Sequence, residues 1–334
     1  MGEASPPLSS DTAPGVPTPA SSWSRVAERG SLWGLRFAAW CIRVVGSRVS
    51  LGLVYAIVTY FFLTDRSGRR ASRAYLERVY ATPAGRAALG RAPGLWASYR
   101  HYRGFALAIV DRLVVWTEAA DDFEFETPGL ERFDRVVADG RGAIILGAHL
   151  GNFDALRLLA RRSGMVVNVL MYTANAERIN TIIRELSPES EARVITVDPD
   201  SVQSVFAVRE RLRRGEHVAI LADRIEPGDR NRSSRVPLLG SPVDLPQAPF
   251  LLATLLECPV AMMVAVRRGP RRYRVYTHVL AERALGPRGE REAVVAELLT
   301  AYARWLGHYC TQEPYQWFNF FDYWGDADAT SESR

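Results

Sequence analysis

The chain has 334 residues, of which 48% are hydrophobic, so it is long enough for one large α/β domain with tails or for two small domains, each with a buried core. Its formal net charge of +5 comes from arginine without any lysine; this fits an anionic membrane surface or a phosphorylated substrate and is too small to indicate nucleic acid, for which no binding motif is present. The three cysteines are far apart, with neither metal-binding spacing nor a disulfide pattern, so we expect a reducing compartment.

The N-terminal third predicts a tail followed by a hydrophobic helical region. Residues 1–28 are rich in Pro, Ser, Ala, Gly and Thr and are expected to be disordered, without the apolar core of a signal peptide. Residues 29–120 contain a strongly apolar run over 44–63, which is long enough to cross a bilayer as a helix but contains Arg48. Both a membrane span and an in-plane hydrophobic anchor remain open, and so does a buried helical hairpin of a soluble domain. Arginine-rich stretches and a helical pattern follow up to residue 118, and the positive-inside rule places them in the cytosol.

From about residue 131 onward, strand-like and helix-like patterns alternate. The near-continuous apolar runs predict strands, and the segments between them have helical periodicity. Such alternation is typical of a mostly parallel central sheet flanked by helices, so we predict one α/β domain over 121–325 and a disordered tail over 326–334. The strands are expected at 143–148, 165–171, 193–197, 217–223, 259–266 and 272–280, and the helices at 131–140, 152–162, 175–187, 201–214, 249–257 and 290–309.

The stretch HLGNFD follows directly after the predicted strand AIILGA and places His149 at the strand's carboxyl end. Ligands of open α/β sheets bind at such ends, and the flanking Gly147 and Gly151 let backbone and substrate approach closely. The offset of five residues across a strand-to-helix turn can bring the Asp154 carboxylate back to the imidazole. Asp154 would then orient His149, which would accept a proton as a general base. The simpler alternative is that Asp154 caps a helix next to a structural histidine.

Other candidate site residues lie on the same predicted edge of the sheet or in the loops beyond it. Asp223 and Arg224 end the strand HVAILAD, and Arg224 and Arg235 are candidates to hold an anionic substrate group, although each also fits an ordinary solvated arginine. Asn152 is a candidate donor to a developing oxyanion or a helix cap. Gly240 and the proline-rich stretch SPVDLP that follows it predict a turn that leads to a helix and shapes the site.

The C-terminal aromatic residues between Trp317 and Trp324 have three possible roles. They can pack in the core, line a tunnel for an acyl chain or lie at a membrane interface. Of these roles, the sequence favours core packing. The histidines outside HLGNFD are expected to be structural or exposed.

HLGNFD resembles the HX4D motif of the lysophospholipid acyltransferase superfamily, and the nearer branch is that of the lipid A lauroyl and myristoyl acyltransferases. The resemblance covers roughly residues 30–325 and is carried by further blocks in family-like order: GEHVAILADR, RVPLLGSPVDLP, PFLLATLLECPV and EPYQWFNFF. The chain departs from the lipid A enzymes where they often have Glu in place of Asp154 and where it ends in WFNFFDYW. These departures leave the acceptor open.

The resemblance implies an O-acyltransferase that moves an acyl group from a thioester to a hydroxyl of a lipid or lipid-like acceptor, with the donor carried by acyl carrier protein or coenzyme A. It also implies a membrane-associated enzyme of the bacterial inner membrane whose catalytic domain is cytoplasmic. His149 and Asp154 would be catalytic, and Gly151, Asn152, Asp223, Arg224, Arg235 and Gly240 would bind substrate. Neither a metal nor another cofactor is expected, because thioester carbonyls are already activated. A hydrolase with the same residues, a non-catalytic membrane protein that binds lipid carriers and, more weakly, a sugar transferase remain alternatives.

Overall fold

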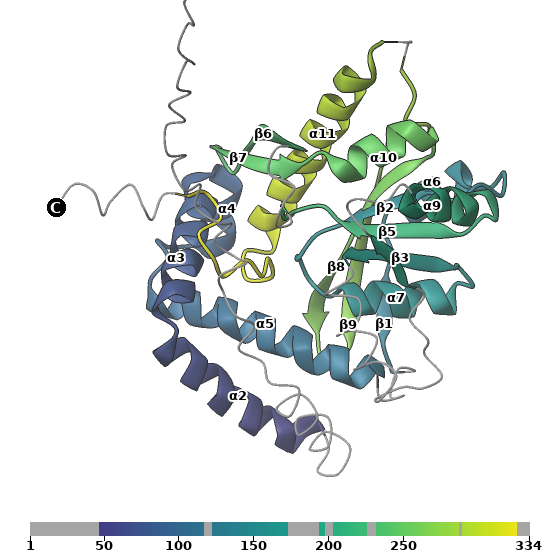
Figure 1. Ribbon diagram of the computed structural model, residues 1–334. Coiled ribbons are helices and arrows are strands. Elements are labelled where there is room, and N and C mark those ends of the chain that lie inside the picture. Colours follow the sequence, from purple (N-terminus) through teal and green to yellow (C-terminus); the bar gives the residue numbers. More distant parts are fainter. Residues whose placement is uncertain are drawn as a thin grey trace, which may run out of the picture.

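The computed structural model describes residues 47–116, 122–172, 194–197, 203–225, 232–286 and 289–325, and all statements below concern these residues (Figure 1). The predicted tails 1–28 and 326–334, the start of the apolar run and the predicted helix 175–187 lie outside them. The strands are β1 Glu124–Glu126, β2 Ile144–Gly147, β3 Val167–Tyr172, β4 Val194–Val197, β5 His217–Leu221, β6 Ser233–Leu238, β7 Ser241–Pro246, β8 Val260–Gly269 and β9 Arg272–Ala281. The helices are α2 Ser47–Thr64, α3 Arg66–Ala81, α4 Pro83–Leu89, α5 Leu95–Trp116, α6 Leu130–Val136, α7 Phe153–Arg162, α9 Gln203–Arg213, α10 Ala248–Leu256 and α11 Arg291–Gln312.

The main sheet has seven strands in the order β1-β9-β8-β2-β5-β3-β4. All neighbouring pairs are parallel except β8 and β9, which run antiparallel. The predicted α/β fold with a mostly parallel sheet is therefore confirmed. Because the sheet is covered on both faces, its central strands are apolar along their whole length, as in β2, in which every residue is buried.

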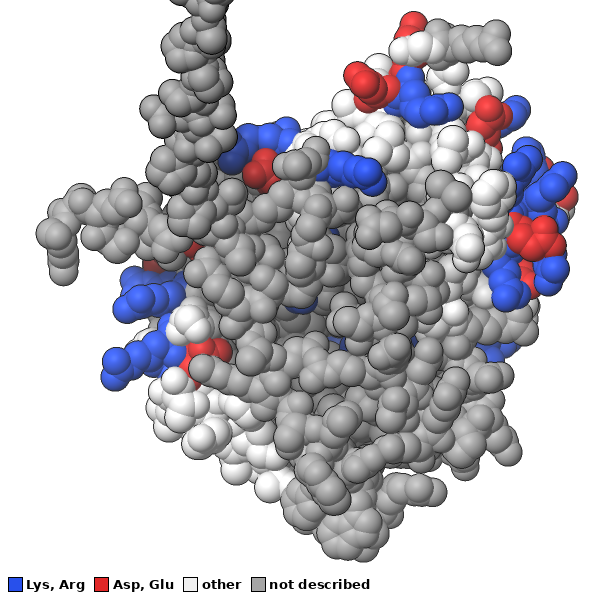
Figure 2. Space-filling view, in the orientation of Figure 1, with Lys and Arg blue, Asp and Glu red and all other residues white. Residues whose placement is uncertain are grey.

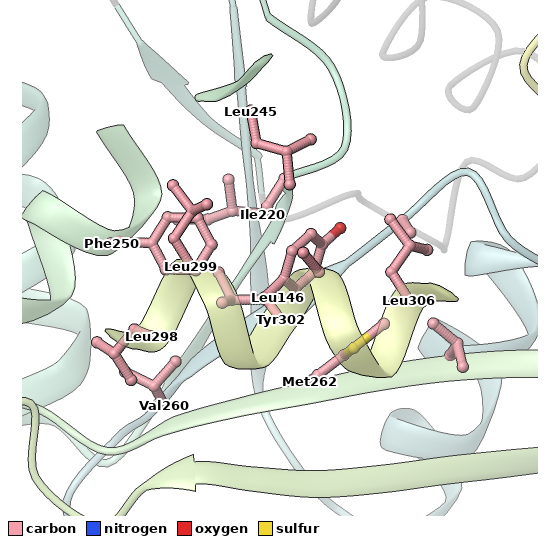
Figure 3. Packing of buried hydrophobic residues seen from close by; sticks show 14 of the residues in the cluster. Leu146, Ile220, Leu245, Phe250, Val260, Met262, Leu298, Leu299, Tyr302 and Leu306 are labelled. Atoms are coloured by element: carbon pink, nitrogen blue, oxygen red, sulfur yellow. The ribbon is translucent and has the colours of Figure 1, made fainter. Parts of the chain in front are cut away.

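Side chains that alternate along β2 separate the two halves of the core. Ile144 and Leu146 belong to the larger cluster, which is covered by α9, α10 and α11, whereas Ile145 faces the opposite side, where α6 and α7 pack. Figure 3 shows the larger cluster around α11, where Tyr302 and Leu299 lie against the strand residues. This packing holds β2 and β5 side by side, and their carboxyl ends carry the candidate site.

The turn predicted at Gly240 is present, and helix α10 follows at Ala248. The predicted role of residues 241–246 is wrong, because they form strand β7, which pairs with β6 in a two-stranded antiparallel hairpin. Leu239 and Gly240 connect the strands with φ values of 53° and 80°, the paired left-handed conformations of a tight hairpin turn. Gly240 is thus a turn residue. A Cβ added to it would meet nothing within 4 Å.

The N-terminal helices form a layer beside the sheet, in which α2 packs on α5 and α3 (Figure 1). None of the helices in the described ranges is long and apolar enough to cross a membrane. The predicted N-terminal anchor is therefore not confirmed as a span. α2 is nevertheless apolar, with Leu53, Ile57, Tyr60 and Leu63 exposed.

Candidate active site

The register between β2 and β5 brings His149 and Asp223 together. Gly147 pairs with Leu221 in this parallel ladder, an offset of 74 residues. Two residues beyond that pair, the same offset places His149 opposite Asp223. Both residues follow the carboxyl ends of their strands, as the sequence predicted, and they are neighbours because β5 lies directly beside β2.

Both oxygens of the Asp223 carboxylate bind His149. Oδ1 lies 2.7 Å from the imidazole Nδ1, and Oδ2 accepts the backbone N–H of His149 at 2.9 Å. Asp223 is completely buried, whereas the His149 side chain is 28% exposed. Nε2 of His149 has no hydrogen-bond partner within the described part of the chain. The imidazole is thus fixed at one nitrogen and able to react at the other.

The C-terminal segment 317–323 completes the surroundings of Asp223, and the sequence analysis did not assign it this role. The Trp317 indole N–H and the Asn319 amide both donate to Oδ2, at 2.9 Å and 3.2 Å, and the Tyr323 hydroxyl donates to the backbone carbonyl of Asp223. The expectation that these aromatic residues pack in the core is correct for Trp317, which is buried. A tryptophan and an asparagine two positions apart in an otherwise apolar segment were the signal available, because buried N–H donors need acceptors.

Electrostatics favour a neutral imidazole beside an ionised carboxylate. Burial alone would raise the pKa of Asp223, but the charge and hydrogen bonds of His149, together with the charge of Arg224, outweigh it and hold this pKa well below its usual range. The pKa of His149 is lowered from its ordinary value, first by burial and then by the positive charge of Arg224; Asp223 opposes this shift only in part. At neutral pH, His149 is therefore available as a proton acceptor.

Residues 150–152 are held tightly between β8 and the C-terminal segment. The Gly151 N–H donates to the Gln316 carbonyl at 2.8 Å, and the Asn152 N–H donates to the Ala265 carbonyl at 2.8 Å. Gly151 has a φ of 75°, and a Cβ on it would lie 1.8 Å from the Ala265 oxygen. The glycine is therefore required for this close backbone approach.

Asn152 is the N-cap of α7, because its side-chain oxygen accepts the backbone N–H of Asp154 at 3.0 Å. Its amide nitrogen donates to the carbonyl of Ala108 and to the hydroxyl of Tyr273, each at 3.2 Å. Both amide hydrogens thus have protein acceptors. This geometry supports the capping alternative rather than the predicted contact of Asn152 with substrate.

Asp154 does not hold the imidazole as the sequence analysis expected. Its carboxylate lies 2.6 Å from Nε of Arg112 and 3.3 Å from Nη1 of Arg157, and Asp223 occupies the position at Nδ1 of His149. Although Asp154 follows His149 by only five residues, it lies in the first turn of α7, which directs its side chain toward Arg112 of α5. The correction is that the carboxylate bound to His149 is Asp223.

The two arginines that were predicted to bind substrate differ in their surroundings. Arg224 lies within the site, where it donates to the Asn319 side chain at 2.7 Å and to the Phe318 carbonyl at 3.0 Å. Arg235 lies on the hairpin, is 71% exposed, and pairs with Asp244 on the opposite strand. The structure does not bring Arg235 or Gly240 into the network around His149.

A buried carboxylate that fixes a neutral histidine at the carboxyl edge of a parallel sheet is an arrangement suited to general-base chemistry. In the described ranges, no three His, Cys, Asp or Glu side chains lie together in a way that could hold a metal ion. Comparison with protein families gives the class of enzyme: residues 20–325 match the model of the bacterial lipid A biosynthesis acyltransferases. The chain belongs to this family of acyltransferases, in agreement with the resemblance seen in the sequence. None of the curated proteins compared with the chain matches it.

Proposed function

We propose that this protein transfers a fatty acyl group from a thioester to a hydroxyl of a lipid or lipid-like acceptor, with His149 as the general base and Asp223 as the carboxylate that orients it. The observation that carries the proposal is the hydrogen bond of 2.7 Å between Nδ1 of His149 and the buried Asp223. Family membership supports an acyl donor and a lipid-like acceptor. The geometry supports His149 and Asp223 as the residues that do the chemistry.

The proposed reaction needs a single proton acceptor. Nε2 of His149 takes the proton of the acceptor hydroxyl as its oxygen attacks the thioester carbonyl, and Asp223 stabilises the imidazolium that forms. When the tetrahedral intermediate collapses, the C–S bond breaks and the thiolate takes the proton from the imidazolium. The products are an ester and a free thiol, and His149 is again neutral. No covalent intermediate on the protein and no cofactor is required.

The donor and the location of the enzyme are parts of the same proposal. The donor is a thioester of acyl carrier protein or coenzyme A, and the acceptor is supplied by the membrane. Arg224 contributes positive charge close to His149, which suits an anionic group on either substrate. The enzyme would act at the cytoplasmic face of the bacterial inner membrane, where both kinds of substrate meet.

An assay of products tests this function. Wild-type protein and His149→Ala are incubated in detergent with acyl carrier protein or coenzyme A thioesters and a total bacterial lipid extract, and the products are identified by mass spectrometry. We expect a new acylated lipid from the wild type and a rate at least roughly 100-fold lower from the variant, because general-base catalysis is lost.

Other products of this assay would replace the proposal. Free fatty acid as the sole product, lost in His149→Ala, would indicate a hydrolase. Equal turnover by both proteins would show that His149 is not the base, and binding of thioester and lipid without turnover would indicate a lipid-carrier-binding protein.

For membrane association, we propose that the exposed apolar face of α2 lies in the bilayer interface. Leu53, Ile57, Tyr60 and Leu63 recur at intervals of three or four residues, so they lie on one side of the helix. The adjoining α5 adds the exposed Trp96. Figure 2 shows uncharged surface at the lower left, where Figure 1 places α2, next to basic side chains at the position of α3. An apolar helix face beside arginines is typical of binding in the plane of an anionic membrane.

Charged substitutions on this face should weaken membrane binding. In the double variant Tyr60→Glu/Leu63→Glu, we expect partitioning into anionic phospholipid vesicles to fall at least tenfold, since two apolar side chains can no longer enter the interface. Vesicle sedimentation measures the effect. Phe206→Glu is the matched control, because Phe206 on α9 is as exposed as Tyr60, at 63%. Equal losses in both variants, or none in the double variant, would contradict this orientation.

A further inference from the structure

Asp154, the carboxylate of the HLGNFD stretch, forms ion pairs with Arg112 and Arg157, and the pair with Arg112 is the shorter. The Arg112 Nε lies 2.6 Å from Asp154 Oδ2, and Arg157 reaches Oδ1 at 3.3 Å. Asp154 is buried, and a buried carboxylate requires such partners. Arg112 lies near the end of α5, a helix that no part of the sequence analysis connected with the site.

Asp111, the residue before Arg112, supports Asn152 at the start of α7 through a second chain of hydrogen bonds. Asp111 accepts the Tyr273 hydroxyl at 2.7 Å and the Arg267 guanidinium at 2.8 Å, and the Tyr273 oxygen in turn accepts the amide of Asn152. Burial, followed by the charge of Asp111, raises the pKa of Tyr273, so its hydroxyl keeps the proton that it donates. The end of α5 therefore holds the start of α7 at two points.

Several elements contribute charged groups to this part of the molecule. Asp223 and Arg224 follow β5, Asp154 begins α7 and Arg112 comes from α5. Tyr302 of α11 bonds the Gly147 carbonyl at 2.8 Å, and Tyr323 bonds the backbone of Asp223. Among the cations, Arg224 and then Arg112 act to lower the pKa of His149. Arg112 thus meets Asp154 directly while its charge also reaches the imidazole.

We propose that Arg112 is a positioning residue of the active site and that Asp154 acts through Arg112 rather than through His149. The ion pair fixes the first turn of α7, and thereby the loop that carries His149, and it balances the charge of Arg112, which acts on the imidazole from α5. Asp223 alone then remains as the carboxylate of the base. The inference rests on the proposed function only in taking His149 as that base.

The test is the pKa of His149 in the full-length protein, measured by NMR titration of the labelled histidine side chains and assigned with His149→Ala. In Arg112→Gln, we expect this pKa to rise by roughly half a unit to one unit, because a cation is removed and Asp154 keeps only Arg157 as an arginine partner. In Asp154→Asn, it should fall by a similar amount, because Arg112 is no longer balanced. In the double variant, it should return close to the wild-type value. A purely structural role for either residue would not give shifts of opposite sign that cancel.

Control variants separate the pair from its surroundings. Arg157→Gln removes a cation from the same carboxylate and should leave the pKa of His149 unchanged, and Arg112→Lys, which retains the charge, should keep it near the wild-type value. If Arg112→Gln does not fold, as judged by circular dichroism, the lysine variant decides. A pKa in Arg112→Lys within a few tenths of a unit of wild type supports the pair, and one that moves as far as in Asp154→Asn overturns it.

Two further results would also overturn the proposal. One is an unchanged pKa in Arg112→Gln, and the other is a double variant that behaves like Asp154→Asn, which would mean that Asp154 acts on His149 directly. None of these measurements depends on acyl transfer. Failure of the product assay would refute the proposed function without deciding the role of Arg112.

Discussion

Asp223→Asn is expected to reduce kcat by roughly 10³–10⁴-fold, with little change in KM. The reason lies in the three N–H groups that converge on Oδ2, from the His149 backbone, Trp317 and Asn319. They require an acceptor there, so an asparagine would turn its oxygen toward them and its NH₂ toward Nδ1 of His149. The imidazole would then carry its proton on Nε2, the nitrogen that accepts the proton of the acceptor hydroxyl in the proposed mechanism.

Kinetics combined with nitrogen NMR of His149 test this prediction. Single-turnover consumption of the thioester gives the rate, and the ¹⁵N shifts of the imidazole give the tautomer. Asp244→Asn is the control, because Asp244 is a partly exposed carboxylate on the hairpin and should have no effect on either measurement. A wild-type rate in Asp223→Asn, or a slow variant whose proton stays on Nδ1, would show that Asp223 does not select the tautomer.

Gly151→Ala is expected to cost about 3 kcal/mol of folding free energy or more, equivalent to a fall of roughly 10 °C in Tm for a domain of this size. The new Cβ would lie 1.8 Å from the backbone oxygen of Ala265, which also accepts the Asn152 N–H and so cannot move away without breaking that bond. Residues 150–152 would have to leave β8, and His149 would move with them.

Gly140→Ala isolates the clash from the conformational strain. Gly140 has a φ of 78°, close to that of Gly151, but a Cβ on it would meet nothing within 4 Å. It should therefore cost only about 1 kcal/mol, the strain of the left-handed conformation. Thermal unfolding followed by circular dichroism compares the two variants. Similar losses of Tm would mean that the close contact with Ala265 does not limit position 151.

Local patterns in the sequence predicted most of the fold and placed His149 and Asp223 at strand ends, but they did not predict that the two residues pair. The apolar run before His149 and the run before Asp223 identified two strand ends on one edge of a parallel sheet, and the structure confirms both. The pairing of the two residues could not be predicted, because it depends on strand order. β5 lies directly beside β2, although β3 and β4 come between them in the chain.

Other parts of the site depend on packing that a single sequence does not display. Asp154 is the nearest carboxylate to His149 along the chain. Only the position of α5 in the fold shows that Asp154 forms an ion pair with Arg112 instead. The proline-containing stretch 241–246 suggested a turn, yet its prolines are tolerated in a short two-stranded hairpin. Trp317 looked like a core residue, and it is one, but its indole N–H also serves the buried carboxylate.

The network around Asp223 also bears on the order of events during folding. The bond between His149 and Asp223 closes a loop of 74 residues, and the bond from Trp317 to Asp223 closes one of 94. Contacts so distant along the chain form after local helices and strands, because the entropy of closing the loops opposes them. An intermediate with β2 already formed but β5 not yet beside it would hold His149 without its carboxylate. The nascent chain therefore assembles the proposed base only when the central sheet and the C-terminal segment have come together, so partly folded molecules are expected to be inactive.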